Sequence, residues 1–344
     1  MKIRLLSLAL VAILLFSMVS CDFFKVQNED EAPKGEATTI NVYTLNGTTG
    51  FGMAKLMNDA KAETTTEKYD FTVKTDASDV TAAILNDSAD IAALPTNAAA
   101  NLYNKSQGGV VVLAVNTLGC LYLLTNQNAT VSSFDDLRGK TVYAPAQNPT
   151  FIFTYLCKQN GLEVGKDITI DSTTYAQPAA LKDAVAAGLV DIAVLPEPMV
   201  TIATNAAKSA NNGTVITNAM DLTAEWNKVS PEGSLVQGCV VVRRAFLEAN
   251  PEAVENFLKE YKASIEYLST DIDSASQMIV DNGIFTNAGV AKKALPNCNV
   301  CFLDGDEMKT AMETYLGVLA GINVNSIGGK LPEADFYYAR KTAA

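Results

Sequence analysis

The sequence predicts an α/β protein with two similar lobes facing one cleft, and a repeated segment is the main observation behind this prediction. Residues 80–95 and 181–196 both run from a helical pattern into Asp-Ile-Ala-x-Leu-Pro, at a constant offset of 101 residues. In each copy the short apolar run is typical of a parallel strand buried on both faces. We therefore expect each lobe to be a mainly parallel sheet flanked by helices. The alternative is ordinary α/β supersecondary structure used twice in one large domain.

The residues that border each repeated strand are the second observation. Asp87 and Gly188 precede the strands and tolerate the left-handed backbone of a helix end. Each strand ends at a proline, which cannot donate to a sheet ladder. Thr96 and Asn97 follow the first proline and Glu197 follows the second. Because ligands of open α/β sheets bind at the carboxyl ends of the strands, these three polar residues are candidate binding residues.

The composition excludes several classes of function. The chain has 344 residues, which suits about two domains, and 48% of them are hydrophobic, so it can bury sizeable cores. It contains no histidine, which excludes histidine-based triads and histidine metal ligands. Its formal net charge is −12, and no basic patch stands out. Nucleic acid is therefore not an expected partner, since phosphate binding depends on clustered Lys and Arg.

The N-terminus has the pattern of an export signal. Lys2 and Arg4 precede an apolar stretch that is short for a membrane span, so residues 1–20 are predicted to be a signal peptide. Small residues before Cys21 resemble the lipobox of bacterial lipoproteins. Cys21 is then the lipidated first residue of the mature chain, and the polar, acidic residues 21–38 are its anchor and tether. The alternative is a plain cleaved signal with an incidental cysteine.

A second cysteine motif lies near the C-terminus. Cys298 and Cys301 have the CxxC spacing of redox and zinc sites. No second CxxC or histidine pair completes a zinc site, and the motif does not open a helix after a strand. A local disulfide or two ordinary thiols are the simpler interpretations, and no metal or cofactor is predicted.

The first part of the chain alternates strands and helices. Residues 39–45 are β-rich and should form the first strand. The glycine-rich turn 46–52 and the following helix place backbone N–H groups where they can face a ligand. Gly50 and Gly52 also begin a dinucleotide motif, but Lys55 replaces its third glycine. The other expected elements are a strand at 69–75, a helix from Ser78, a strand ending at Pro95, a helix at 98–105, a strand at 110–115, a polar break at 116–119 and a strand at 120–125.

The second part repeats this order of elements. The loop 145–150 precedes a helix over 151–160, so Gln147, Asn148 and Thr150 should lie at a helix N-terminus. The segment around Trp226 has no clear pattern. The other expected elements are strands at 141–144 and 167–171, a helix opened by Pro178, a strand from Asp191, a turn and strand at 209–218, a strand at 238–243, a helix capped by Asn250 with Val254, Phe257, Leu258, Tyr261, Ile265 and Leu268 on one face, and helices at 273–281 and 305–320.

The order of these motifs resembles the solute-binding lipoproteins of ABC importers, in the branch that binds nitrate, sulfonates, taurine and thiamine precursors. The resemblance covers residues 39 to about 320. It implies the type II periplasmic-binding-protein fold, in which two α/β lobes joined by two crossovers form a hinge and close over a solute. The segments that carry it are 40–52, Asp135 to Lys140, 145–150, Gly188 to Asp191, Leu195 to Pro198 and Arg244 to Pro251.

The resemblance also implies domain boundaries and a binding site. Lobe 1 should consist of residues 39–121 and 239–344, and lobe 2 of residues 122–238. Loop amides and neutral side chains from both lobes would hold the solute, because helix N-termini attract anions without a buried arginine. The expected ligand-binding residues are Asn46, Gly47, Thr48, Thr49, Gly50, Phe51, Thr96, Asn97, Asn116, Thr117, Gln147, Asn148, Thr150, Tyr175 and Glu197.

The expected function is solute capture for import. The chain would be a lipid-anchored monomer on the outer face of a bacterial cell membrane, delivering an anion such as a sulfonate, or a heterocycle such as a thiamine precursor, to an ABC permease and its ATPase. A related enzyme group makes a thiamine pyrimidine, but it needs an active-site histidine and a cysteine cluster, which this sequence lacks. We therefore predict no catalytic residues. A lipoprotein sensor or surface partner with the same fold and no transport role is the other alternative.

Overall fold

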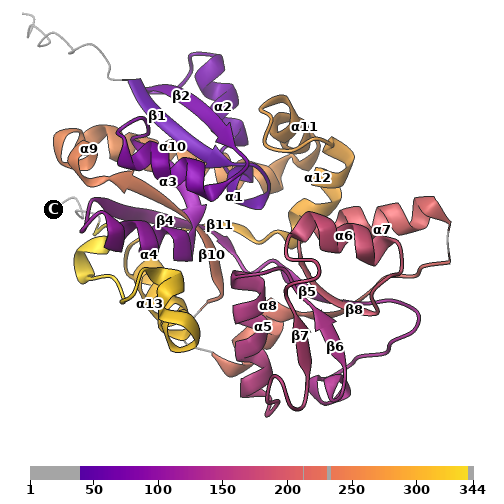
Figure 1. Cartoon of the computed structure of the whole chain (residues 1–344). Helices are drawn as coiled ribbons and strands as arrows, with labels where there is room; N and C mark the ends of the chain where they lie inside the picture. The colour runs from indigo at the N-terminus through magenta and orange to yellow at the C-terminus, as the bar shows by residue number, and fades with distance from the viewer. Residues whose placement is uncertain (1–38, 212, 231–233, 340–344) are drawn as a thin grey trace, which may run out of the picture. The chain divides into compact units, whose positions relative to one another are not determined.

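Two β-sheets form the frame of the computed structural model, which describes residues 39–211, 213–230 and 234–339 (Figure 1). The strand order is β11-β4-β10-β3-β1-β2 in the first sheet and β7-β6-β8-β5-β9 in the second. The first sheet contains β1 (Thr39–Leu45), β2 (Lys68–Lys74), β3 (Ile91–Pro95), β4 (Val110–Leu118), β10 (Val236–Arg243) and β11 (Val300–Leu303). The second contains β5 (Leu121–Thr125), β6 (Thr141–Tyr143), β7 (Thr169–Asp171), β8 (Ile192–Pro196) and β9 (Thr217–Asp221).

Most strands of each sheet run in one direction, as the sequence predicts. Strands β1, β2 and β3 are mutually parallel, and β10 lies antiparallel between β3 and β4. In the second sheet β6, β7 and β8 are parallel, and β5 lies antiparallel between β8 and β9. The chain crosses to the second sheet at β5, directly after β4, and returns at β10. The two-lobed α/β class is therefore confirmed. We call the first sheet with its helices lobe 1 and the second sheet with its helices lobe 2.

Helices cover both faces of both sheets. Every helix of the described residues is too short or too polar to cross a lipid bilayer. Those of lobe 1 are α1 (Thr48–Phe51), α2 (Ala54–Lys61), α3 (Ala77–Leu85), α4 (Thr96–Lys105), α9 (Arg244–Ala249), α10 (Pro251–Thr270), α11 (Ile272–Asp281), α12 (Ala288–Ala294) and α13 (Gly305–Asn323). Those of lobe 2 are α5 (Asn148–Gln159), α6 (Pro178–Ala186), α7 (Met199–Ala210) and α8 (Leu222–Val229). Short 3₁₀ turns are η1 (Phe134–Leu137), η2 (Leu295–Asn297), η3 (Val324–Ile327) and η4 (Ala334–Phe336).

The two copies of the repeat fold alike up to their prolines. Asp87 and Gly188 both adopt the predicted left-handed conformation, with φ of 62° and 72°. Strands β3 and β8 then run to Pro95 and Pro196, with every residue before the proline buried. Both strands are central in their sheets, so both of their faces are covered. This agrees with the expectation that a continuous apolar run marks a strand buried on both sides.

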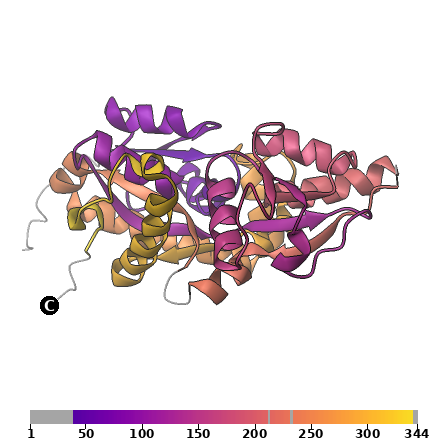
Figure 2. The same cartoon turned by 60° about the horizontal axis from the view of Figure 1, so that its bottom comes forward.

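One apolar core runs from lobe 1 into lobe 2 through the C-terminal helix α13. The ring of Trp226, on α8, lies 5.9 Å from the ring of Tyr315, on α13, and 4.8 Å from that of Tyr155, on α5. Trp226 and Tyr315 are fully buried. Figures 1 and 2 both show α13 beside α5, although the two helices belong to different lobes. The segment around Trp226, which had no clear sequence pattern, is therefore a helix at the junction of the lobes.

Tertiary contacts change three of the predicted elements. Residues 116–118 extend β4 instead of breaking it, because β10 and β11 pair with them on both sides. Residues 48–51 form the short helix α1 rather than an open turn. The apolar face predicted for α10 is buried. The Asn250 side chain does not cap that helix, however, because its amide donates to the carbonyl of Phe246 in α9.

Candidate functional site

The loops after β1 and β8 meet where the two lobes face each other. The hydroxyl of Thr48 in α1 donates to the backbone carbonyl of Glu197, at 3.0 Å. On the lobe 1 side, the side-chain amide of Asn116 donates to the carbonyl of Thr49 at 3.2 Å, and the hydroxyl of Thr117 donates to Asn116 Oδ1 at 3.0 Å. These residues are far apart in the sequence, and the carboxyl ends of their strands bring them together.

A second contact between the lobes joins the starts of α4 and α5. The Asn148 side-chain amide donates to Asn97 Oδ1 at 2.7 Å. The residues at the N-caps of these helices, Pro95 and Gln147, make no side-chain capping hydrogen bond. Free N–H groups at a helix start carry about half a positive charge and attract anions. The structure therefore brings two uncapped helix N-termini together, one from each lobe.

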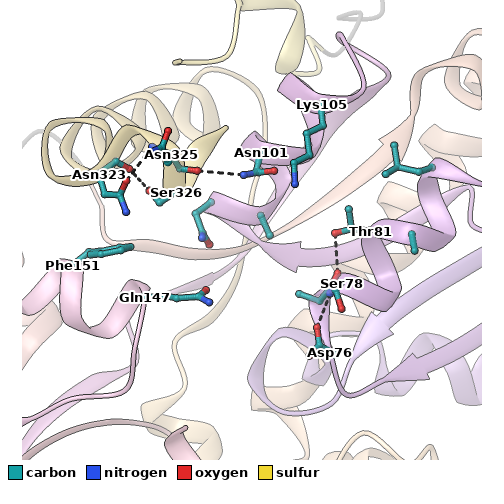
Figure 3. A pocket seen from close by; sticks show the side chains of 15 residues that line it. Asp76, Ser78, Thr81, Asn101, Lys105, Gln147, Phe151, Asn323, Asn325 and Ser326 are labelled. Atoms are coloured by element: carbon teal, nitrogen blue, oxygen red, sulfur yellow. Dashed lines mark hydrogen bonds between the residues drawn. The ribbon is translucent and has the colours of Figure 1, made fainter. Parts of the chain in front are cut away.

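A cavity of about 590 Å³ opens beside this contact. It lies between α3 and α4 of lobe 1, the start of α5 in lobe 2, and the segment that follows α13 (Figure 3). Gln147 points into the space from the α5 side, with Phe151 one turn further along the helix. The lining residues are Asp76, Ala77, Ser78, Thr81, Ala82, Leu85, Asn97, Ala98, Asn101, Lys105, Gln147, Phe151, Asn323, Asn325 and Ser326.

Of the residues predicted from the sequence, only Asn97 and Gln147 line this cavity. Asn148, Thr48, Thr49, Asn116, Thr117 and Glu197 take part in the contacts between or beside the lobes described above. Asn46 is exposed at the end of β1, and the backbone N–H of Gly47 donates to Ile284. Gly50 packs so closely that a Cβ would lie 2.1 Å from the carbonyl oxygen of Leu45.

Four other predicted residues serve the scaffold in this structure. Phe51 is fully buried, with its ring 6.0 Å from that of Phe285. The hydroxyl of Thr96 is buried and donates to the carbonyl of Val236, at 2.7 Å. The hydroxyl of Thr150 donates to the carbonyl of Pro145, and the ring of Tyr175 lies 5.8 Å from that of Tyr143. The first two side chains point into packed protein, while the other two shape loops at the edge of lobe 2.

Glu197 is the one acidic residue of the predicted set, and it is buried. Its carboxylate accepts hydrogen bonds from the backbone N–H and the hydroxyl of Thr201, in the first turn of α7. Burial raises the pKa of this carboxyl, while the hydrogen bonds from Thr201 oppose that shift. The carboxylate of Glu197 thus caps the N-terminus of α7, whereas no side chain caps the N-termini of α4 and α5.

Sequence reasoning did not find several of the lining residues. Asn101 lies one turn after Asn97 on α4, so helical spacing could have identified it. Phe151 lies in the first turn of α5 and looks like an ordinary apolar core residue. Asn323, Asn325 and Ser326 come from the end of α13 and from η3. No local signal connects them to a site built by residues about two hundred positions earlier.

Thiols and metal ligands do not form a reactive centre in the part of the chain that the structure describes. No three Cys, Asp or Glu side chains there gather in a way that could hold a metal ion. Cys298 and Cys301 are free, so the ordinary-thiol interpretation of the CxxC motif holds. Burial raises the pKa of the Cys120 thiol to about 12 and also raises that of Cys298. Both therefore stay protonated near neutral pH, which makes them poor nucleophiles.

Several solved structures share this fold, and some of them are named as binding components of transport systems. An ABC transporter protein from Parabacteroides distasonis is 22% identical, with 88% of this chain and 100% of that chain covered and a TM-score of 0.71. The periplasmic aliphatic sulphonate binding protein SsuA from Escherichia coli is 14% identical, with 87% and 95% covered and a TM-score of 0.67. A ligand-binding component of an ABC-type import system from Staphylococcus aureus, with zinc bound, is 12% identical, with 88% and 96% covered and a TM-score of 0.64.

The comparison of sequences points in the same direction. The comparison with curated proteins found no match. At the identities above, the solved structures establish the fold alone. A family model described as the phosphonate ABC-transporter periplasmic substrate-binding protein matches residues 52–283, which is more than half of the chain. The chain therefore belongs to this family of periplasmic substrate-binding proteins, and it is the extracytoplasmic substrate-binding component of an ABC importer.

Proposed function

We propose that the protein captures a solute with one singly charged oxyanionic group between its two lobes. The observation that supports this most is the contact of Asn97 with Asn148, which brings the uncapped starts of α4 and α5 together beside the 590 Å³ cavity. We propose the lobe boundaries predicted from the sequence, residues 39–121 with 239–344 and residues 122–238; strands β5 and β10 begin one and three residues before the two crossover points, at Leu121 and Val236. Of the fifteen predicted residues, we propose that those at the cleft bind the solute, with Asn97, Gln147 and Asn148 nearest the anion, whereas Gly50, Phe51 and Thr96 support the site from packed protein.

The charge of the solute follows from the groups available to neutralise it. None of the fifteen residues is Lys or Arg, and the two charged residues that line the cavity, Lys105 and Asp76, offset each other's charge. Each helix start carries about half a positive charge, so two of them offset about one negative charge. A sulfonate carries one charge at neutral pH, whereas a fully ionised phosphonate carries two. We therefore expect sulfonates to bind more tightly than dianionic phosphonates, although the matching family model is described by phosphonate.

The binding experiment compares anions of similar size and different charge. Trp226 is the only tryptophan in the sequence and lies where α13 meets lobe 2, so closure of the lobes should change its fluorescence. Fluorescence titration and calorimetry would use ethanesulfonate, nitrate, methylphosphonate at a pH where it is dianionic, and an aminopyrimidine. Ethanesulfonate should bind at least about tenfold more tightly than the phosphonate, a difference of about 1.4 kcal/mol. Tighter binding of the phosphonate or the pyrimidine would contradict the proposal.

A matched pair of variants tests the place of binding. Asn148→Ala removes the side chain that donates to Asn97, while Asn160→Ala changes the same residue type at the other end of α5. We expect the first change to weaken ethanesulfonate binding by about fivefold, because a hydrogen bond between polar groups contributes about 1 kcal/mol. The second change should have no effect. Equal affinities for the two variants would place the anion elsewhere.

Membrane attachment is a separate part of the proposal. Cys21 lies outside the described residues, and the lipobox pattern before it is the support for a lipid anchor. The protein would then be held at the outer face of the membrane, where it delivers its solute to a permease and ATPase. Growth with a labelled fatty acid should label the wild-type protein and not a Cys21→Ala variant, which should be released from the membrane fraction. Equal labelling of the two would disprove the anchor.

The remaining alternative is a sensor or surface partner of the same fold. The same protein would then bind a solute without passing it to a permease. Vesicles that contain the cognate permease and ATPase distinguish the two roles. Import predicts that the loaded protein stimulates ATP hydrolysis and solute uptake, whereas a sensor leaves both unchanged. We propose no enzymatic activity, in keeping with a family of binding proteins.

A further inference from the structure

The cavity beside Asn97 and Gln147 is much larger than a small oxyanion. A water molecule occupies about 30 Å³ in the liquid, so ethanesulfonate, with six non-hydrogen atoms, needs on the order of 150 Å³. The cavity measures about 590 Å³, which is in the range of pockets that hold ligands of several functional groups. An anion at the starts of α4 and α5 would leave most of this space unfilled. The body of the solute should therefore extend from the anionic group toward η3.

Two carboxamide side chains at the cavity have no hydrogen-bond partner among the described residues. The side chains of Gln147 and Asn325 make no hydrogen bond with any other described residue. The Asn101 amide reaches the carbonyl of Asn325 only at 3.4 Å, which is a long and weak contact. Figure 3 shows Asn101 and Asn325 at one end of the space and Gln147 at another. These amides can both donate and accept, which is what neighbouring hydroxyl groups on a solute require.

Other side chains hold this wall in place. The Asn104 side-chain amide donates to the carbonyl of Ile327 at 2.8 Å and to that of Lys330 at 2.7 Å. The backbone N–H of Asn325 donates to Asn323 Oδ1 at 3.1 Å. The turn η3 is thus tied to α4 of lobe 1, although it lies outside the residues 52–283 that the family model matches. A wall built by this segment can differ between members of the family and adjust the choice of solute.

An apolar side completes the cavity. Phe151 is half-buried in the first turn of α5 and lies among the lining residues with Leu85 and three alanines of α3 and α4. An aromatic ring with amides around it suits a ligand that has an apolar face and polar edges. A sugar ring has this chemistry, since its C–H bonds form the face and its hydroxyls form the edge.

We propose that the solute is a polyhydroxylated monoanion of the sugar-acid or sugar-sulfate class. This inference rests on the proposed oxyanion function and adds the recognition of the solute's body. Gln147 and Asn325 hydrogen-bond its hydroxyls, Phe151 packs against its C–H face, and its anionic group lies at the starts of α4 and α5. Asn325 and Phe151 are then residues that determine specificity, while the helix starts provide the attraction common to all anions.

The test uses two sulfate esters with the same charged group. Glucose 6-sulfate, ethyl sulfate and glucose would be titrated into the whole exported protein by calorimetry. We expect glucose 6-sulfate to bind at least about tenfold more tightly than ethyl sulfate, and glucose to bind more weakly than either ester. If ethyl sulfate binds as tightly as the sugar ester, the proposed function survives and this inference is wrong. If neither ester binds, the oxyanion function itself is wrong, and the inference with it.

Variants of Asn325 and Phe151 test whether these residues cause the preference for the sugar ester. Asn325→Ala and Phe151→Leu should each weaken glucose 6-sulfate binding by about fivefold to tenfold, which corresponds to one hydrogen bond or one ring contact. Both should leave ethyl sulfate within twofold, because that ligand does not reach the wall. Gln277→Ala, on the remote helix α11, is the control and should change neither affinity. An equal loss for both esters, or no loss for the sugar ester in the Asn325→Ala protein, would overturn the inference.

Discussion

Residues 87–97 and 188–198 follow the same path up to their prolines and then diverge. After Pro95 the chain enters α4 at once, with Thr96 as its first residue and no side-chain cap. After Pro196, Glu197 and Pro198 intervene before α7, and the Glu197 carboxylate accepts from the backbone N–H of Thr201. The start of α7 is therefore supplied with an anion by the protein, while the start of α4 is left for a ligand. Two copies of one motif thus contribute differently to one cleft.

The acidic residues at the start of the two strands differ as well. Asp90 is buried, and its carboxylate accepts from Arg243 at 2.8 Å and from the backbone N–H of Asn41 at 3.0 Å. Asp191 is exposed and accepts from the side-chain amides of Asn126 and Asn128. The hydrogen bond from Asn128, followed by that from Asn126, holds the pKa of Asp191 below its usual value. The aspartate that precedes the repeated strand is thus buried in lobe 1 and exposed in lobe 2.

The largest expected effect is a difference in stability between alanine variants of these two aspartates. Asp90→Ala should lower the free energy of unfolding by about 3 kcal/mol, because it leaves the partly buried Arg243 without its main partner. Asp191→Ala should lower it by only about 1 kcal/mol, since water can replace the lost hydrogen bonds. Urea denaturation followed by circular dichroism measures both values. Equal losses would show that burial does not distinguish the two copies.

A new charge at the free helix start should have the next largest effect. Asn97→Asp places a carboxylate beside the uncapped N-terminus of α4, where it would repel an anion and occupy the N–H groups. We expect the affinity for ethanesulfonate to fall by about tenfold to a hundredfold, that is by about 1.4–2.8 kcal/mol. Calorimetry measures the loss, with Gln277→Glu on α11 as a control for net charge. Unchanged affinity in the Asn97→Asp protein would remove α4 from the site.

The left-handed residue before β8 allows a smaller test. Gly188 has φ of 72°, and a Cβ there would lie 2.7 Å from the hydroxyl of Thr214. Gly161 has nearly the same φ, 74°, with nothing within 4 Å of its Cβ position. Both glycine-to-alanine changes should destabilise the protein by about 1 kcal/mol through the backbone alone. Gly188→Ala should be the worse of the two in thermal unfolding, and the reverse order would argue against crowding by Thr214.

The smallest expected effect is the pH dependence of Glu197. Because burial raises the pKa of this carboxyl in the folded protein, its favourable contribution is complete below the unfolded pKa of about 4.5 and is lost as pH rises through the folded value. Glu197→Gln cannot ionise, so its melting temperature relative to the wild type should rise between pH 4 and pH 7. A relative melting temperature that falls over this interval would mean that the hydrogen bonds from Thr201 outweigh burial.

Local patterns correctly predicted strands that are apolar on both faces and a helix that is apolar on one face. The continuous apolar runs before Pro95 and Pro196 correctly predicted buried strands, and the spacing of apolar residues correctly predicted the buried face of α10. Asn148 was expected at a helix start and lies there. In each case the pattern of residues lies within a segment of about twenty residues. Burial of one or both faces of a strand or helix requires that pattern, so it can be recognised without knowing the rest of the fold.

Other features depend on partners that are distant in the sequence. Residues 116–118 look like a polar break, yet they form a strand because β10 and β11 flank them. The family resemblance placed fifteen residues near a cleft, but it could not distinguish Asn97, which lines the cavity, from Phe51, which is packed in the core. Both follow a strand, and only the packing around them decides which way each side chain points.

The sequence by itself determined the two-lobed α/β class and the matching strand ends, because periodicity, prolines and residue types are local properties. The tertiary structure decided which helix starts remain free, how the Asn97 and Asn148 side chains meet, and that Asn325 from the far end of the chain forms a wall of the cavity. These features arise only when strands and helices from separate parts of the chain pack together, since a cavity is the space that several elements leave unfilled.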